Sequence, residues 1–426
     1  MKEDLLHYIW KYKKYPNTRL KTTSGSAVLI KAVGMHNQLS GSDFFNASLE
    51  IDGQIWAGNV EIHLKSSDWY AHNHEKDTSY NNVILHVVWE DDVSVFRADG
   101  SEIPTLELKN FISDELLVNY KKLFHGAKDR TINCQSDIKI ISDFTFNNWM
   151  ERLYFERLEH KSQVISELLE TSKNDWEKVL FILLFKNFGS KINGNHFFEI
   201  AKSLDFSIVR KLYNKPLELE GLLFGLTGLL SNVNELDPYQ KKLKTAFDFL
   251  VHKHELTGDV FGKAEFFKLR PSNFPTIRLS QFAALYASNN NLFQDLMHLE
   301  GRDLSALFNC KASSYWDTHF TFGKTSGKRA KTISKKFIDL LVINTIMPLK
   351  FCYQKHNGIP LTDSFTQDIE HIAKEDNAII QRFLDLDVTV ESAKDTQALL
   401  ELYHNYCSTN KCLQCAVGTA LLNLKH

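Results

Sequence analysis

The sequence is poor in proline and cysteine, with 8 and 6 among 426 residues. Few prolines favour long uninterrupted helices, because proline breaks the interior of a helix. Six cysteines in so long a chain are not a disulfide scaffold. No run approaches the roughly 18 apolar residues of a membrane-spanning helix. The charged start Met1–Asp4 also lacks the features of a secretory signal. These absences predict a cytoplasmic protein that makes no use of a membrane.

An excess of charge of one sign is also missing. The 50 Lys and Arg residues against 52 Asp and Glu residues leave a formal net charge of -2. Nucleic-acid binding would therefore need a local basic patch. The content of 43% hydrophobic and 24% charged residues is ordinary for a globular protein and excludes a disordered or fibrous chain. The 30 Phe residues predict a thick aromatic core.

The hydrophobic pattern changes character near residue 115. Before that point, short apolar runs predict strands over residues 27–33, 44–51, 55–64, 83–89 and 93–108, with hairpin turns at Asp52-Gly53 and Asp99-Gly100. After residue 145, apolar residues recur at helical spacing. We predict an α+β protein with a small mixed-sheet domain over residues 1–145 and a larger all-α domain over residues 146–426. The segment with Cys134 and Ile138 to Ile141 is expected to return a strand to the first domain.

The densest group of reactive side chains lies between Asp43 and His86. The period of two along a strand places Glu61 and His63 on one face and the apolar residues between them on the other. A three-residue turn after the preceding strand would bring Asp43 to the face of Glu61. A two-residue turn would do so only with a bulge near Gly58. Two carboxylates on one face can bind Mg²⁺ or Mn²⁺, which polarises a phosphoryl oxygen and activates water.

This arrangement resembles the PD-(D/E)xK nuclease superfamily. The sequence has Ser42-Asp43 at the start of one strand and Glu61-Ile62-His63 on the next. The resemblance implies a restriction-endonuclease-like first domain, in which Asp43 and Glu61 hold the ion and His63 orients or deprotonates water. Two departures from the pattern stand out. Ser42 takes the place of proline, and His63 takes the place of the usual lysine.

Further histidines and acids surround this motif. We expect these residues to form an outer shell or a second metal site. The set consists of Asp68, His72, His74, Asp77 and His86. In an alternative interpretation, His63, His72, His74 and Asp77 bind Zn²⁺ or another transition metal, since imidazole suits such ions. His86, inside an apolar strand, is also compatible with an ordinary hydrogen-bonded core residue.

The C-terminal region carries Cys407-x4-Cys412-x2-Cys415, with His404 three residues before the first cysteine. A pair of cysteines separated by two residues is a common metal-binding spacing, and thiolates select Zn²⁺ or an iron–sulfur cluster. His404 is the nearest candidate for the fourth ligand, with Cys352 or Cys310 as alternatives. The alternative is three buried or partly buried thiols at the end of a helix, without a metal.

Basic residues gather in two places of the second domain. Arg270 and Arg278 flank a proline-rich turn, and Lys324, Lys328 and Arg329 lie in a run without acidic residues. Such side chains can hold the phosphates of DNA or RNA. A solvated loop and a network of ion pairs at the start of a helix are the alternatives.

Several longer motifs are similar to the bacterial family labelled domain of unknown function 2851. They are Gly41-Ser42-Asp43-Phe44, Gly58 to His63, Ser67-Asp68-Trp69-x-x-His72-x-His74, Tyr80 to His86, Arg270 to Arg278, and the C-terminal cysteines. The resemblance implies no activity. The residues themselves favour a metal-dependent nuclease. The alternatives are a non-enzymatic nucleic-acid-binding or scaffold protein with a decayed nuclease-like core, and a zinc hydrolase based on His63, His72 and His74.

Overall fold

The protein is described by a computed structural model that covers residues 2–37, 39–125, 131–231, 237–256, 262–298, 306–362 and 364–425. The chain divides into two compact units. The first consists of Met1–Trp149, Asp385–Asp387 and Leu402–His426, and the second of Met150–Leu384 and Val388–Glu401. The last 25 residues, Leu402–His426, therefore pack within the first unit, whereas the hydrophobic pattern places them in the helical domain.

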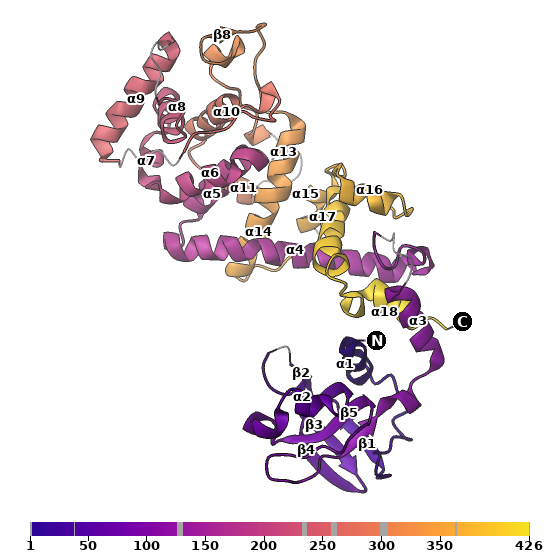
Figure 1. Cartoon of the computed structure of the whole chain (residues 1–426). Helices are drawn as coiled ribbons and strands as arrows, with labels where there is room; N and C mark the ends of the chain where they lie inside the picture. Colours follow the sequence, from indigo (N-terminus) through magenta and orange to yellow (C-terminus); the bar gives the residue numbers. More distant parts are fainter. Residues whose placement is uncertain are drawn as a thin grey trace. The chain divides into compact units, whose positions relative to one another are not determined.

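A mixed six-stranded sheet forms the centre of the first unit (Figure 1). Its order is β1-β3-β4-β5-β6, with β2 paired to β3. The pairs among β1, β3 and β4 are antiparallel, whereas β5 runs parallel to both β4 and β6. The prediction of an α+β protein with a mixed sheet is confirmed. The strands are β1 (Val28–Ala32), β2 (Met35–His36), β3 (Phe44–Ile51), β4 (Gln54–Lys65), β5 (Val83–Glu90) and β6 (Thr105–Glu107).

Helices cover the two faces of this sheet. The amphipathic helix α1 (Glu3–Lys11) buries its apolar side against Val60 and Ile62 of β4. The short helix α2 (Asp68–Ala71) and the 3₁₀ turns η1 (His74–Lys76) and η2 (Thr78–Tyr80) follow β4. Trp69 of α2 lies in a second, smaller apolar cluster. The alternation of β4 thus separates an apolar face from a face that carries Glu61 and His63.

Two sequence predictions for this unit were wrong. The segment expected to return a strand forms a 3₁₀ turn, η4 (Ile138–Ile140), that buries Ile138 alone. Of the strands expected over residues 93–108, only β6 forms, although the predicted turn at Asp99-Gly100 is present and is closed by the isolated bridge between Phe96 and Glu102. Short apolar runs do not distinguish a strand from another buried segment, because burial alone produces the same pattern.

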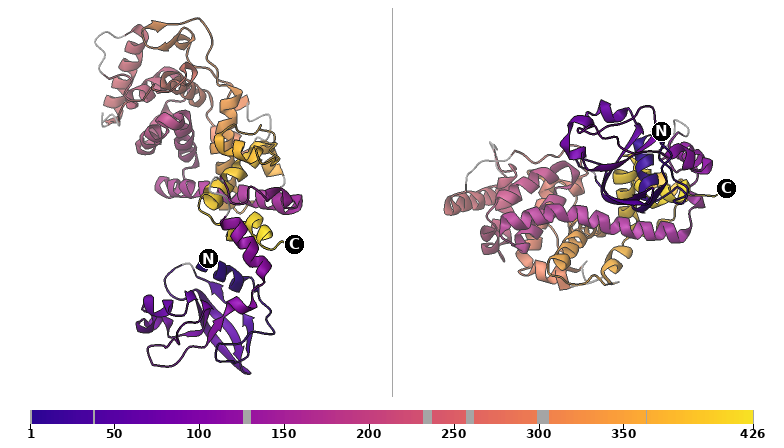
Figure 2. Two further views of the ribbon diagram at one scale, coloured as in Figure 1. Left: turned by 45° about the vertical axis from the view of Figure 1, so that its right-hand side comes forward. Right: turned by 90° about the horizontal axis from the view of Figure 1, so that it is seen from below.

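The C-terminal segment is held to α1 and α3 (Asp114–Phe124) by hydrogen bonds. The Asn119 amide of α3 donates to the carbonyl oxygens of Leu422 and Leu424 at 3.3 and 3.0 Å. The Asn423 amide donates to the Tyr8 hydroxyl of α1 at 2.7 Å. Helix α18 (Ala416–Leu422) consequently lies beside α3 (Figures 1 and 2).

The named elements in the described residues of the second unit are helices and the hairpin of β7 (His319–Thr321) and β8 (Lys324–Thr325). Stacked phenylalanines fill its centre, as the phenylalanine content suggests. Phe185 lies 4.6 Å from Phe197 and 5.0 Å from Phe282 between ring centroids. No described helix is long and apolar enough to cross a membrane. The helices are α4 (Asp143–Ser172), which starts in the first unit, α5 (Trp176–Phe188), α6 (Ser190–Ser203), α7 (Phe206–Lys211), α8 (Pro216–Leu226), α9 (Pro238–His254), α10 (Pro275–Ser288), α11 (Leu292–His298), α13 (Lys335–Leu341), α14 (Met347–His356), α15 (Ser364–Glu370), α16 (Ala378–Leu384) and α17 (Ala393–Leu402).

Candidate functional site

The register of the β3–β4 hairpin places Asp43 beside Glu61. The turn contains only two residues, Asp52 and Gly53, and a bulge at Asn46, with φ of 55°, shifts the pairing so that Phe44 faces Val60. The Asp43 amide then donates to Glu61 Oε2 at 3.2 Å, and the Ile62 amide donates to Asp43 Oδ2 at 2.9 Å. The two carboxylates are therefore neighbours because of a bulge opposite Asn59, next to Gly58, as the two-residue turn requires.

Three imidazoles meet next to Glu61. One nitrogen from each of His63, His72 and His74 can be chosen so that all three lie within 4.8 Å of one another. His63 Nε2 lies 3.1 Å from His72 Nδ1. Glu61 Oε1 lies 3.3 Å from His74 Nε2 and 3.7 Å from His63 Nε2. Three imidazole nitrogens thus lie close together, and the buried Glu61 carboxylate adjoins two of them, those of His63 and His74.

The local fold turns His72 and His74 back toward β4. His72 ends α2, and Asn73 adopts the left-handed conformation with φ of 60° before His74 starts η1. The His74 ring stacks on Tyr80 at 3.8 Å and meets the edge of Trp69 at 5.3 Å between centroids. Aromatic packing therefore fixes His74, whereas His72 is exposed and forms the solvent side of the cluster.

His86 supports His63 from the neighbouring strand. The parallel register places it across from Glu61, and its Nε2 lies 2.8 Å from His63 Nδ1. Both side chains are buried. If His86 Nε2 accepts, His63 carries its proton on Nδ1 and directs the lone pair of Nε2 into the cluster. This is the tautomer that a metal ligand requires.

Burial determines the protonation of the cluster. Burial, together with the nearby imidazoles, lowers the pKa of His63 to about 2, and burial lowers the pKa of His86 to about 3. Burial also raises the pKa of Glu61, against the hydrogen bond from His74, and Asp43 raises it further. Neutral imidazoles keep their lone pairs free, so protons do not compete with a metal at His63.

Two residues of α1 complete the site and were missed by the sequence analysis. His7 Nε2 lies 3.4 Å from Asp43 Oδ2. Burial lowers the pKa of His7, but Asp43, Glu3 and Asp4 more than compensate and leave it raised. Burial and the nearby carboxylates raise the pKa of Glu3 to about 7, although His7 opposes this. Glu3 and His7 are one helical turn apart, so their spacing could have revealed a shared polar face.

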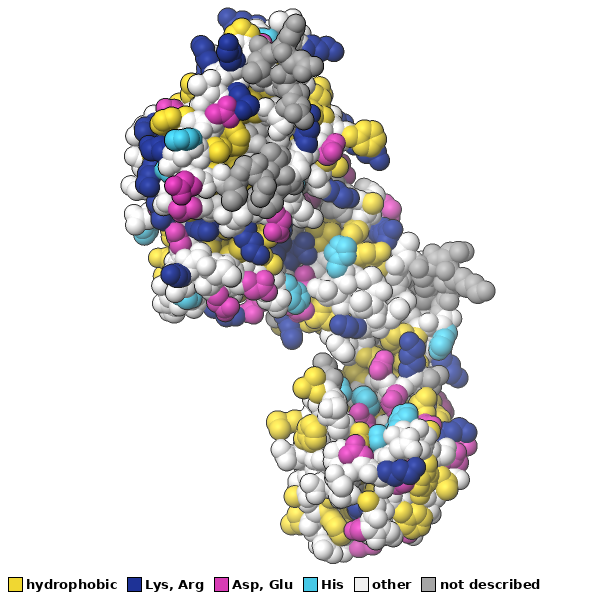
Figure 3. Space-filling model, turned by 60° about the vertical axis from the view of Figure 1, so that its left-hand side comes forward, with side chains coloured by type: hydrophobic (Ala, Val, Ile, Leu, Met, Phe, Trp, Pro, Cys, Tyr) yellow, Lys and Arg dark blue, Asp and Glu magenta, His cyan; other side chains and the backbone are white. Residues whose placement is uncertain are grey.

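Two of the predicted outer residues have local structural partners. The Lys65 amide donates to Asp68 Oδ2 at 3.0 Å. The exposed Asp77 accepts from the amide and hydroxyl of Ser79, which lower its pKa. These carboxylates stabilise turns. In the view of Figure 3, histidine and acidic side chains adjoin on the surface of the first unit.

Comparison with known sequences places the chain in a family. The sequence model described as protein of unknown function DUF2851 matches residues 3–378. The chain belongs to this family. No curated protein and no solved structure matches it. In this DUF2851 member the matched range includes Glu61, His63, His72 and His74, which we call the His63 cluster. It ends before the C-terminal cysteines.

The predicted cysteine cluster has a different fourth member. Cys134 lines one small cavity with Cys407, Cys412 and Cys415. The exposed His404 is not among the residues that line this cavity, and its ring faces Tyr403 at 5.6 Å. Cys310 and Cys352 belong to the second unit. Spacing along the chain could not reveal Cys134 as a neighbour of the other three, because the chain returns to it only after the whole second unit.

The predicted basic residues fall into two groups. Arg270, Lys324, Lys328 and Arg329 are exposed. Arg278, in contrast, is only 7% exposed. Its guanidinium donates to Asn273 Oδ1 at 2.7 Å and Gln281 Oε1 at 3.0 Å, and it lies 3.5 Å from the centre of the Phe337 ring. Among the described residues no carboxylate pairs with Arg278, so the alternative of an ion-pair network is not formed around it.

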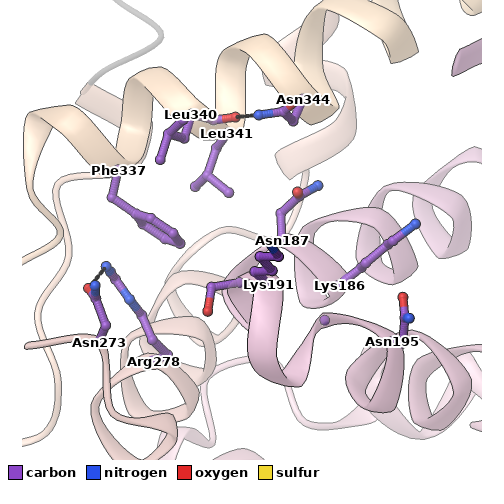
Figure 4. A pocket seen from close by; sticks show the side chains of 12 residues that line it. Lys186, Asn187, Lys191, Asn195, Asn273, Arg278, Phe337, Leu340, Leu341 and Asn344 are labelled. Atoms are coloured by element: carbon purple, nitrogen blue, oxygen red, sulfur yellow. Dashed lines mark hydrogen bonds between the residues drawn. The ribbon is translucent and has the colours of Figure 1, made fainter. Parts of the chain in front are cut away.

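Arg278 borders a cavity of about 700 Å³ within the second unit. Lys186 and Lys191 also line it, together with several asparagines, and no acidic residue is among the described lining residues. Figure 4 shows Arg278 and Asn273 on one side of this space and Asn187 and Lys191 on the other, with Phe337 and Leu341 above. Positive charges and amide groups around a cavity suit an anionic ligand such as a phosphate.

Proposed function

We propose that this DUF2851 member is a divalent-metal-dependent phosphodiesterase that acts on nucleic acid. The observation that carries the proposal is the meeting of His63, His72 and His74 with the Glu61 carboxylate, beside Asp43. Three imidazoles and a carboxylate are a donor set for Mn²⁺, Fe²⁺ or Zn²⁺ more than for Mg²⁺, which prefers oxygen ligands and water. The proposed ion is therefore a transition metal, and Mn²⁺ accepts both donor types.

The side chains supply the remaining chemistry. A bound ion would polarise a phosphoryl oxygen and lower the pKa of a coordinated water. The exposed side at His72 leaves room for a substrate oxygen, as an open catalytic site requires. Because Asp43 and Glu3 hold a proton on His7, that imidazolium can donate the proton to the departing oxygen of the broken ester. Glu61 supports the ion, and His86 fixes the ring of His63.

The substrate class is supported by the second unit. Its acid-free cavity at Arg278, Lys186 and Lys191 suits a phosphate group, and the exposed Lys324, Lys328 and Arg329 offer further positive charge. Such contacts neutralise a polyanion without selecting its sequence. The mixed sheet, with Asp43 beside one strand and Glu61 and His63 on the next, supports a restriction-endonuclease-like origin of the first unit.

The test is cleavage of single- and double-stranded DNA and RNA with Mn²⁺, Zn²⁺ or Mg²⁺, in the wild type and in two variants. His72→Ala removes an exposed ligand at little risk to folding, and His125→Ala is the matched control at an exposed histidine outside the cluster. We expect His72→Ala to lose at least a hundredfold in cleavage at low metal concentration, while His125→Ala keeps wild-type activity. Full activity of His72→Ala would refute the proposed site.

Two other outcomes identify the alternative functions. Tight binding of oligonucleotides without cleavage, whichever ion is present, would favour a nucleic-acid-binding or scaffold protein. Stoichiometric Zn²⁺ at His63, His72 and His74 with hydrolysis of carboxylic esters or amides only would favour a zinc hydrolase that does not act on nucleic acid.

A further inference from the structure

The four cysteines of the first unit gather around one small, mostly apolar cavity. Cys134 lies just before η4, whereas Cys407, Cys412 and Cys415 surround the 3₁₀ turn η9 (Cys412–Gln414). Cys412 and Cys415 are buried, and Cys134 and Cys407 are half-buried. Burial raises the thiol pKa of Cys134 and of Cys407, and the neighbouring cysteines raise it further. All four are free thiols, so no disulfide explains their convergence.

Hydrogen-bond donors point at two of these sulfur atoms. Burial raises the pKa of Cys415 to about 11, and the backbone amides of Val417 and Gly418 and the side chain of Trp149 oppose this rise. The Asn133 amide donates to Cys412 Sγ at 3.3 Å. Donors of this kind stabilise a thiolate, the form of cysteine that binds a metal, and they form the supporting shell of a metal ligand.

Gly418 makes this turn possible. A Cβ at this position would come within 2.1 Å of the Cys412 carbonyl oxygen. The close approach of Gly418 to Cys412 folds the Cys-x2-Cys segment tightly around the start of α18. Both sulfur atoms of the segment consequently face the same cavity as Cys134 and Cys407.

We propose that Cys134, Cys407, Cys412 and Cys415 are the four ligands of a metal centre, and that this centre is an iron–sulfur cluster. Zinc–sulfur bonds of about 2.3 Å in a tetrahedron would hold all sulfur atoms roughly 3.8 Å apart. In the described part of the chain, no three cysteine sulfur atoms lie within 4.8 Å of one another. In a cluster each thiolate binds a different iron atom, so the sulfur atoms of the ligands lie farther apart than around a single zinc ion.

The centre would link segments that are distant in sequence. Asn133 and Cys412, which contact each other here, are 279 residues apart. Closing so long a loop with a cross-link removes many conformations from the unfolded chain. The cluster would also hold α18 and Asn423, which donates to Tyr8 of α1. Because α1 carries Glu3 and His7, the centre would keep this helix beside the His63 cluster.

The experiment is anaerobic purification of the full chain, followed by measurement of iron, zinc and acid-labile sulfide. The variants are Cys134→Ser and His404→Ala, and the matched controls are Cys310→Ser and Cys352→Ser. We expect iron and sulfide in the wild type, in His404→Ala and in both controls, and a loss of at least tenfold in Cys134→Ser. Retention of iron in Cys134→Ser with loss in His404→Ala would overturn the ligand set. Zinc without sulfide would overturn the cluster.

A second measurement does not depend on the folding of a variant. The wild-type protein is treated with a thiol-alkylating reagent before and after removal of the metal by a chelator under native conditions, and modified cysteines are located by mass spectrometry. We expect Cys134, Cys407, Cys412 and Cys415 to be protected together and to become reactive together. Unchanged reactivity of Cys134 on metal removal would contradict the proposal.

Discussion

The contact between His86 and His63 allows a quantitative prediction about metal binding. Replacing His86 with Phe keeps a ring beside Trp69, whose centroid is 5.6 Å away, but removes the partner 2.8 Å from His63 Nδ1. His63 is then free to adopt the wrong tautomer, and a buried polar atom loses its hydrogen bond. Loss of such a supporting partner weakens metal affinity about 10- to 100-fold. The unpaired nitrogen itself costs about 1–3 kcal/mol of stability.

The two effects can be separated by urea denaturation with and without Mn²⁺ or Zn²⁺. At a free metal concentration one hundred times the wild-type Kd, binding stabilises the wild type by about 2.7 kcal/mol. In His86→Phe the same concentration would contribute only about 1.4 kcal/mol if affinity falls tenfold, or about 0.4 kcal/mol if it falls a hundredfold.

The matched variant is His86→Gln, whose amide can replace the hydrogen bond and should recover most of the affinity. His125→Ala again serves as the exposed control. Wild-type metal affinity in His86→Phe, measured by titration calorimetry on folded protein, would refute the role of His86. Equal losses in His86→Phe and His86→Gln would show that packing, and not the hydrogen bond, supports His63.

Three further predictions follow from particular contacts. Gly58→Ala would place a Cβ 2.5 Å from Ile84 Cγ2, so we expect a loss of about 1–3 kcal/mol in urea denaturation, whereas Gly327→Ala, with open space around it, should have a much smaller effect. Because the pKa values of the buried His63 and His86 are lowered, the unfolded chain binds more protons than the folded protein below pH 6.5. The free energy of unfolding therefore decreases as the pH is lowered. Glu3, with its raised pKa of about 7, opposes this decrease between pH 7 and 4.5. The metal-free Glu3→Gln variant should therefore lose stability more steeply than the wild type as the pH is lowered over that range. An unchanged dependence of stability on pH would contradict the burial of Glu3 near the site. Finally, Arg278→Gln should weaken the binding of pyrophosphate, measured by calorimetry, roughly 10- to 100-fold, as expected for hydrogen bonds of about 1.5–3 kcal/mol to a charged group. The control variant Arg270→Gln should bind pyrophosphate as the wild type does.

Local sequence patterns predicted the structure best where all the residues concerned lie in one strand or helix. The alternation in β4 correctly separated Val60 and Ile62 from Glu61 and His63, because strand geometry alone determines which side chains share a face. The bounds predicted for β3 agree with the structure for the same reason. The prediction of a strand at Ile138 failed because a single buried side chain in a 3₁₀ turn produces the same apolar pattern as the start of a strand.

The sequence by itself therefore determined the mixed α+β organisation, the pairing of Glu61 with His63, and the enrichment of histidine beside them, since each depends on neighbours along the chain. Only the tertiary structure decided which residues join them. The bulge at Asn46 brings Asp43 next to Glu61, the left-handed Asn73 turns His74 inward, and α1 supplies Glu3 and His7. Cys134 meets the C-terminal cysteines for the same physical reason. Packing brings together side chains from distant segments, and no local periodicity records which segments will meet.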